Sequence, residues 1–226
     1  MIVLFDSHAH VNTTDTGKYP VAPLSGSLAP TALADAWPAE RLIAAMDRAG
    51  VSRAVVVQRA HVYGFDNSYC LDAAAAFPDR LRALCVIDGR SDGAADATRH
   101  CLDRGALGIR FTEPEKGAGL DWLNSDGALA AWRLAVDRGA SIRVHMYRWN
   151  RIEALAALLD IVRRFPQTTL VLDHLSNLAP ESGPDFGIDE PLRRLMEHRG
   201  THLMFSMINL GRWERDGVKA APVIRR

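Results

Sequence analysis

The strongest constraint on the fold of this chain is a repeated alternation of two hydrophobic patterns. Short runs rich in β-branched residues are typical of buried strands, and each is followed by a longer segment with apolar residues at helical spacing. The seven predicted strands are Ile2–Asp6, Arg53–Val57, Leu81–Ile87, Leu107–Phe111, Ser141–His145, Thr169–His174 and His202–Ser206. The predicted helices are Ala39–Ala49, Ser68–Phe77, Ala94–Arg104, Asp126–Arg138, Ile152–Phe165 and Glu190–His198.

The nearly continuous apolar character of these strands favours a parallel sheet, because such strands are buried on both faces under helical connections. Gly50, Gly105 and Gly139 each follow a predicted helix, where a residue with positive φ ends a helix at low cost. Seven strand–helix units in series are many for a doubly wound sheet, and no G-x-G-x-x-G follows any strand. The pattern therefore predicts an α/β fold, the TIM-type (β/α)8 barrel.

The chain stops before an eighth strand could form. Successive predicted strands begin about 30 residues apart, so an eighth would begin at roughly residue 232, beyond Arg226. The tail from Asn209 carries charges that suit a helix or coil, and its one weak apolar run, Val218–Ile224, contains Pro222, which cannot donate to a strand ladder. We therefore expect one barrel domain, residues 1–226, that is incomplete at its C-terminal end. Its first and seventh strands would border a gap, which predicts low solubility.

The composition excludes several functional classes. The 226 residues contain 27 lysines and arginines and 27 aspartates and glutamates, so the chain lacks the basic surface that nucleic acid or an anionic membrane attracts. No apolar run is long enough for a signal peptide or a membrane span. The three cysteines are odd in number and form no C-x-x-C pair, which is typical of a reduced, cytoplasmic protein. We expect a small-molecule substrate, and a homo-oligomer is compatible with the composition.

One segment, residues 11–37, is irregular and rich in threonine, proline, glycine and serine. Loops longer than about 15 residues are usually functional or disordered. Since this segment follows the first strand, it should lie at the carboxyl-terminal rim of a barrel, where active sites are built. It is therefore predicted to be a loop at the rim of the active site.

Four histidines lie at the carboxyl ends of predicted strands. His8 and His10 follow the first strand two residues apart, His145 ends the fifth, and His174 ends the sixth. A single histidine in such a place is more often a hydrogen-bonded structural residue than a ligand, and H-x-H alone is a weak motif. Three independent placements at one end of a parallel sheet favour a common site. Imidazole nitrogens so placed suit zinc or a similar divalent ion.

Two further residues are candidate substrate ligands at the same rim. Arg110 ends the fourth strand, where a guanidinium needs a carboxylate partner; either a substrate carboxylate or nearby Glu113 could supply it. His61 follows the second strand, and no other feature of the sequence supports its assignment as a substrate ligand. The five tryptophans are more typical of packing than of stacking platforms, and they are Trp37, Trp122, Trp132, Trp149 and Trp213.

Several short blocks, taken together, resemble the amidohydrolase superfamily, in particular the amidohydrolase-related (amidohydrolase 2) branch with sugar lactonases and 2-pyrone-4,6-dicarboxylate lactonase. Asp6-Ser7-His8-Ala9-His10 resembles the first-strand D-x-H-x-H of that family. The other similar blocks are Ala45–Val51 with Ala54–Gln58, Phe77–Leu81, Gly108–Phe111 and Leu172–Leu175. Their order and spacing are specific, and the resemblance extends to about Ser206.

The resemblance implies a distorted barrel that hydrolyses a lactone, ester or amide of a small carboxylated substrate. In metal-dependent relatives, the residues that match His8, His10 and His145 bind the ion, for which zinc or manganese is expected. The residue that matches His174 lies beside the ion and polarises or protonates the substrate. Some lactonases of this branch work without metal, so the cofactor could also be absent.

The family carries an aspartate on its eighth strand as general base, and no block here matches it, because Asp216 lies in a polar turn. We therefore expect at most one weakly bound divalent ion, since the acidic ligand is missing. A truncated chain and a genuine short variant both fit this difference. Three functions stay open, namely the hydrolase, a metal-dependent decarboxylase or hydratase of a small carboxylic acid, and an inactive truncated remnant.

Overall fold

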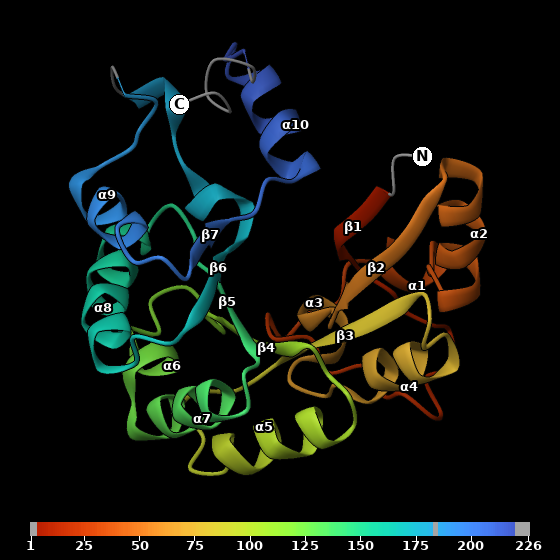
Figure 1. Cartoon of the computed structure of the whole chain (residues 1–226). Coiled ribbons are helices and arrows are strands. Elements are labelled where there is room, and N and C mark those ends of the chain that lie inside the picture. The colour runs from red at the N-terminus through yellow and green to blue at the C-terminus, as the bar shows by residue number, and fades with distance from the viewer. Residues whose placement is uncertain (1–3, 183–184, 220–226) are drawn as a thin grey trace.

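The computed structural model describes residues 4–182 and 185–219 and contains seven parallel strands in one curled sheet (Figure 1). Each strand pairs with its neighbours in chain order, from the first to the seventh. The strands are β1 (Leu4–Ala9), β2 (Val51–Val57), β3 (Leu81–Val86), β4 (Gly108–Thr112), β5 (Ser141–His145), β6 (Thr169–Leu172) and β7 (Thr201–Leu203). This arrangement is a TIM-type barrel without its eighth strand among the described residues, as the sequence predicts.

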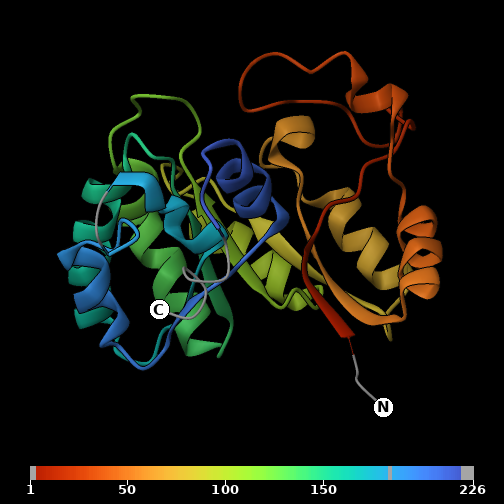
Figure 2. The ribbon, with the colours of Figure 1, turned by 90° about the horizontal axis from the view of Figure 1, so that it is seen from above.

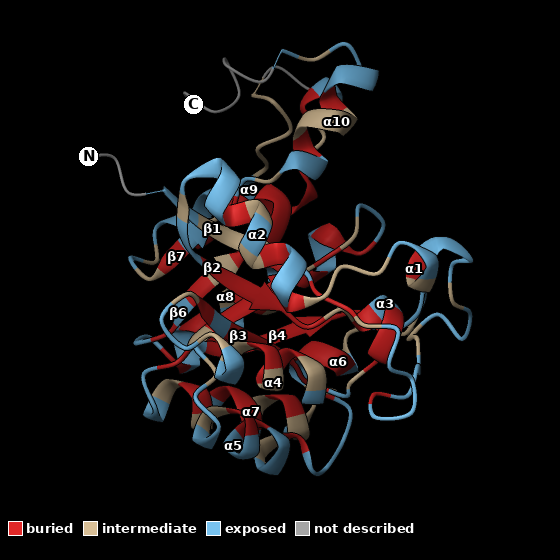
Figure 3. Ribbon diagram, turned by 90° about the vertical axis from the view of Figure 1, so that its right-hand side faces the viewer, coloured by how far each residue is buried: buried red, intermediate tan, exposed pale blue. Residues whose placement is uncertain are grey.

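Helices alternate with the strands and cover the convex face of the sheet (Figures 1 and 3). The longer helices are α2 (Ala39–Ala49), α4 (Ser68–Ala76), α5 (Ala94–Asp103), α7 (Asp126–Asp137), α8 (Arg151–Arg164), α9 (Glu190–Met196) and α10 (Met207–Arg215). The short ones are α1 (Thr31–Ala34), α3 (Ala60–Tyr63), α6 (Asp121–Asn124) and the 3-10 turns η1 (Asp173–Asn177) and η2 (Pro180–Ser182). None of the described helices has the length and apolar character needed to cross a membrane.

The main core lies between the sheet and these helices. Phe111 of β4 stacks on Trp132 of α7, with ring centroids 5.8 Å apart and planes within 8°. Trp122 and Trp213 are also fully buried, so the predicted packing role is confirmed for these three tryptophans. The close contact of β4 with β5 depends on Gly108, where a Cβ atom would lie 2.0 Å from the carbonyl oxygen of Ser141. Only glycine fits this position.

The strand ends differ from the prediction at two places that matter for the site. β1 extends to Ala9, because its pairing with β2 continues to Val56, so His8 lies within the strand instead of after it. β6 ends at Leu172, and the next segment turns into η1. Four successive non-glycine residues there, 174–177, have φ between 51° and 53°. Such left-handed backbone costs about 1–3 kcal/mol per residue and persists only where its surroundings hold it.

The sheet is open between its two edges. β1 and β7 each pair with one neighbour, and a cavity of about 590 Å³ separates β1 from the start of α10. The predicted gap is therefore confirmed for the described residues. The charged tail forms α10, consistent with the expected helix or coil. Residues 220–226 lie outside the described part of the chain, so the prediction for most of Val218–Ile224 stays a prediction.

The rim segment, residues 11–37, contains α1 and otherwise has no regular structure. In Figure 2 it extends, in red and orange, over the end of the sheet where α3 lies. Backbone hydrogen bonds from Ala22 to Val62 (2.8 Å) and from Leu24 to Ala60 (3.2 Å) attach it to α3. This segment thereby becomes one wall of the pocket described next.

Candidate active site

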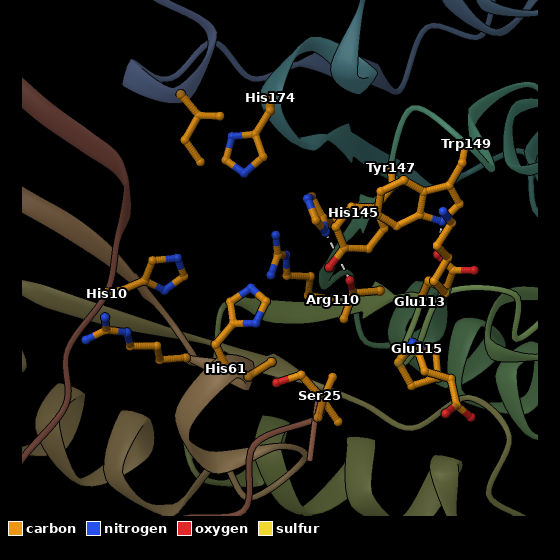
Figure 4. A pocket seen from close by; sticks show the side chains of 17 residues that line it. His10, Ser25, His61, Arg110, Glu113, Glu115, His145, Tyr147, Trp149 and His174 are labelled. Atoms are coloured by element: carbon orange, nitrogen blue, oxygen red, sulfur yellow. Dashed lines mark hydrogen bonds between the residues drawn. The ribbon is translucent and has the colours of Figure 1, made fainter. Parts of the chain in front are cut away.

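A cavity of about 580 Å³ opens at the carboxyl ends of the strands (Figure 4). Side chains from β4, β5 and α10, from the segments after β1, β2, β4, β5 and β6, and from the rim segment line it. They include His10, Leu24, Ser25, Arg59, His61, Arg110, Thr112, Glu113, Glu115, Lys116, His145, Tyr147, Trp149, His174 and Ile208. Five of the six site residues predicted from the sequence are in this set. The sixth, His8, contacts the rings of His10 and His174, with centroids 4.8 and 5.0 Å away.

The first-strand histidines form a close pair. Nε2 of His8 lies 3.2 Å from Nε2 of His10, and Nδ1 of His10 lies 2.8 Å from the carbonyl oxygen of Val57. Because a carbonyl oxygen can only accept, Nδ1 of His10 carries the proton and Nε2 holds a lone pair. Nε2–H of His8 therefore donates to Nε2 of His10 when no ion lies between them.

His174 is held by a second defined network. Its Nδ1 lies 2.7 Å from the hydroxyl of Ser206, and that hydroxyl donates to Oδ1 of Asn209 at 3.2 Å. The Ser206 oxygen therefore accepts from Nδ1–H, and Nε2 of His174 holds the lone pair. The amide of Asn209 also donates to the carbonyl oxygen of His174 at 2.8 Å. These contacts support the left-handed turn and orient the ring.

His145 completes the row of imidazoles. Its Nδ1 lies 3.0 Å from the hydroxyl of Thr112, and its ring centroid is 5.4 Å from that of His174. In each of His10, His145 and His174, Nδ1 is hydrogen-bonded to a carbonyl oxygen or a hydroxyl of another residue. Nε2 is therefore the ring nitrogen that can contact a ligand. Hydrogen bonds of this kind fix the orientation of reactive histidines.

All four histidines are neutral at pH 7. Burial is the main cause: it lowers the pKa of His8 and of His145 far below the usual range, and the pKa values of His10 and His174 to about 4. The positive charge of Arg110 contributes in every case. The His10 ring borders two cavities, so solvent can reach it. Protein atoms nevertheless surround it closely enough for desolvation to be the main cause of its lowered pKa.

Arg110 is paired below the pocket with Asp173, whereas the sequence suggested a substrate carboxylate or Glu113 as its partner. Its Nε donates to Oδ2 of the fully buried Asp173 at 2.6 Å, while Glu113 makes other contacts. Arg143 approaches Oδ1 of Asp173 to 3.9 Å and donates to the carbonyl oxygen of Ser7 at 2.8 Å. Two buried guanidinium groups thus share one carboxylate, which leaves a positive charge beneath the histidines.

Trp149 does not pack in the core, contrary to the expectation for the tryptophans. Its side chain borders the pocket and is 53% exposed. It stacks on Tyr147, with centroids 4.3 Å apart and planes within 6°. The loop after β5 places the Tyr147 ring 4.6 Å from that of His145, with Trp149 stacked on Tyr147. A short loop of this kind gives no apolar periodicity from which the arrangement could be predicted.

His8 and His10 could supply two ligands to a metal ion, but the described residues do not complete the ligand set. The 3.2 Å between Nε2 of His8 and Nε2 of His10 is close to the spacing of about 3.4 Å expected for two histidines on one tetrahedral zinc ion. Among residues 4–182 and 185–219, however, no group of three or more histidines, cysteines and carboxylates is placed to hold an ion. His145 is thus not assembled with the pair, and we derive no chemical step through a metal.

The fold and the row of strand-end histidines agree with a comparison against known protein families. The family model described as amidohydrolase matches residues 5–226. The chain belongs to the amidohydrolase family. Membership alone does not specify a substrate.

Solved structures share the fold of this amidohydrolase at low sequence identity. A probable 2-pyrone-4,6-dicarboxylic acid hydrolase from Acinetobacter baumannii, with citric acid bound, has a TM-score of 0.68 at 20% identity, over 89% of this chain and 69% of that one. A zinc-bound amidohydrolase from Burkholderia multivorans has a TM-score of 0.65 at 16% identity, with the same coverage of 89% and 69%. A manganese-bound 5-carboxyvanillate decarboxylase from Novosphingobium aromaticivorans has a TM-score of 0.56 at 16% identity, over 79% and 68%.

Proposed function

We propose that this amidohydrolase hydrolyses a cyclic ester or amide of a small carboxylated molecule. One observation carries the proposal: three neutral histidines with anchored Nδ1 atoms line one cavity beside a buried arginine. Neutral imidazoles can take up and return protons, and a cavity of this size suits a small molecule. The hydrolase and decarboxylase among the similar structures support a small acid as substrate.

In this proposal Arg110 and His61 bind the substrate and His174 moves the proton. The guanidinium of Arg110 lines the cavity and attracts a substrate carboxylate, because Arg143 adds a second positive charge beneath it. Nε2 of His174 takes a proton from the attacking water and returns it to the leaving oxygen or nitrogen. The pKa of about 4 for His174 makes its protonated form a strong acid toward an alkoxide and its neutral form a weak base toward water, so the proton donation to the leaving group is the step that it serves best.

Decarboxylation of a small carboxylic acid is the second candidate. Of the described carboxylates that line the cavity, Glu113 and Glu115 lie at the end away from His10 (Figure 4). Asp173 is paired with Arg110. Asp6 lies beside the adjoining cavity that His8, His10 and His174 also line. The lining of the main cavity therefore has no free carboxylate beside its histidines to activate water among the described residues, and loss of CO2 does not require one.

A substrate panel distinguishes the two reactions. The purified chain is incubated with carboxylated lactones, cyclic amides and carboxylated aromatic acids, and the release of acid and of CO2 is measured separately. We expect acid release without CO2, and His174→Ala should lower the rate about 10²–10⁴-fold. The matched control is His100→Ala, an exposed histidine on α5. CO2 release, no turnover of any compound, or equal rates in His174→Ala would contradict the proposed hydrolysis.

A further inference from the structure

The pocket has a second end whose chemistry differs from that of the histidine end. In Figure 4, Tyr147 and Trp149 lie on the far side of His145 from His10. Their stacked rings form a flat aromatic wall, and the outer ring, Trp149, is half exposed. None of the proton transfers proposed above uses this wall. A flat, accessible indole surface in a small-molecule cavity is suited to stacking on a planar group.

The aromatic wall is held rigidly in place. Oε2 of Glu113 accepts a hydrogen bond from the indole Nε1–H of Trp149 at 2.7 Å, and Oε1 accepts from the backbone N–H of Gly117 at 3.1 Å. Glu113 is itself buried. On the other side of the stack, the backbone N–H of Tyr147 donates to Oδ1 of Asn150 at 2.8 Å. A ring fixed before the ligand arrives loses little entropy on binding.

A positive charge accompanies this wall. The ammonium of Lys116 lies over the Trp149 ring, 5.4 Å from its centroid, so a planar ligand that stacks there moves this flexible side chain toward the edge of the ring. The nearby carboxylates are engaged elsewhere, since Glu113 accepts two hydrogen bonds and Glu115 faces Arg90 at 3.7 Å. Lys116 can therefore offer its charge to a ligand that lies on the indole.

We propose that Trp149 and Lys116 form a distal subsite that binds a planar, negatively charged part of the substrate. The planar part stacks on Trp149, and its carboxylate pairs with Lys116. This proposal rests on the proposed function in one respect: it assumes that the reacting group of the substrate lies at the histidine end of the cavity. It makes Trp149 a residue that selects flat, unsaturated rings over saturated ones.

Equilibrium binding of two matched diacids tests the subsite without turnover. Isophthalate and cis-cyclohexane-1,3-dicarboxylate carry the same two carboxylates, but only the first is flat. Calorimetric titration of the whole chain should show isophthalate binding about five- to tenfold more tightly, as expected for one aromatic stack. Trp149→Leu should abolish this preference, and Trp149→Phe should retain most of it.

Two further variants separate stacking from charge. Lys116→Met should weaken both diacids several-fold and leave their ratio unchanged. Trp37→Leu, at a half-buried tryptophan that stacks with Arg41 outside the cavity, should leave both affinities and the ratio unchanged. Both Trp149 variants remove the indole donor to the buried carboxylate of Glu113, which costs about 1–3 kcal/mol. They are therefore expected to melt below the parent chain but still to unfold cooperatively, which thermal unfolding verifies, and binding is measured well below that transition.

The inference is wrong if the parent chain binds the two diacids equally, or if the preference persists in Trp149→Leu. A chain that hydrolyses nothing but keeps a preference dependent on Trp149 would refute the proposed reaction and leave the subsite standing. A chain that hydrolyses lactones but binds the two diacids equally would support the proposed reaction and refute the subsite. The two failures are therefore distinguishable.

Discussion

Asp173 holds Arg110 through a 2.6 Å contact between Oδ2 and Nε, and the two residues stand 63 positions apart in the chain. Arg110 lies within β4 and Asp173 directly follows β6, and β5 with its Arg143 lies between these two strands. Both guanidinium groups and the carboxylate are buried. This pairing supports the floor of the candidate site, and its removal should be costly.

We predict that Asp173→Asn destabilises the chain by about 3–5 kcal/mol. The substitution preserves shape but leaves two buried arginines without a counter-ion, and breaking a buried pair costs about this much. Urea denaturation at pH 7 measures the loss in free energy of unfolding. The control is Asp160→Asn, at a side chain that is 68% exposed and pairs with Arg163, where we expect less than about 1 kcal/mol. An Asp173→Asn chain as stable as the control would contradict the prediction.

Asp72 should make a contribution to stability that depends on pH. Its carboxylate accepts hydrogen bonds from Arg104 (2.8 Å) and from Tyr19 of the rim segment (2.6 Å). The hydrogen bond from Arg104 is the largest cause that lowers its pKa from 3.8 to about 2. Since the pKa is lower in the folded state, this contribution is complete above about pH 4 and is lost as the pH falls toward about 2.

The corresponding variant is Asp72→Asn, with a loss of about 1 kcal/mol at pH 7, a value reduced because the side chain is partly exposed. The penalty should shrink steadily below pH 4, as urea denaturation at several pH values between 7 and 2.5 would reveal. Asp96→Asn, at a side chain that is 82% exposed, serves as control. A penalty that stays constant or grows as the pH falls would show that Asp72 does not act through its charge.

We predict that the chain binds at most one divalent ion, and weakly. His8 and His10 supply two nitrogen ligands, but the described residues add no third one in place. Dialysis against zinc followed by elemental analysis should give no more than one equivalent, which is removed by chelator and abolished in His10→Ala. His100→Ala should not change the amount bound. Stoichiometric zinc that survives chelator would mean that other residues complete the ligand set.

The open edge of the sheet should cause self-association. Phe5 on β1 is 56% exposed, and the edge of β1 has no strand beside it among the described residues. A charged residue on an exposed edge strand opposes pairing with other chains. Phe5→Lys should therefore raise the monomer fraction, which light scattering after size-exclusion chromatography measures. The matched control, Ile152→Lys on α8, replaces a residue that is 52% exposed and should have no effect. A parent chain that is monomeric at high concentration would contradict the prediction.

The order of strands and helices could be predicted from the sequence because the signal is local. Hydrophobic periodicity and the glycines at helix ends, such as Gly50 with φ of 67°, act within a few residues. The meeting of His10, His145 and His174 followed as well, since the carboxyl ends of parallel strands all lie at one edge of a sheet. The resemblance of short blocks such as Asp6–His10 to the amidohydrolase superfamily predicted the family, which the family model confirms.

Only the tertiary structure decided which groups contact one another within that edge. The pairing of Arg110 with Asp173 in place of Glu113, and the clamp that turns Trp149 toward the pocket, join segments of the chain that no local pattern connects. The left-handed turn at His174 likewise depends on Asn209, 35 residues away. The sequence determined the fold class and the candidate residues, because periodicity encodes burial. Partners, tautomers and pocket walls depend on long-range packing, and only the folded chain defines them.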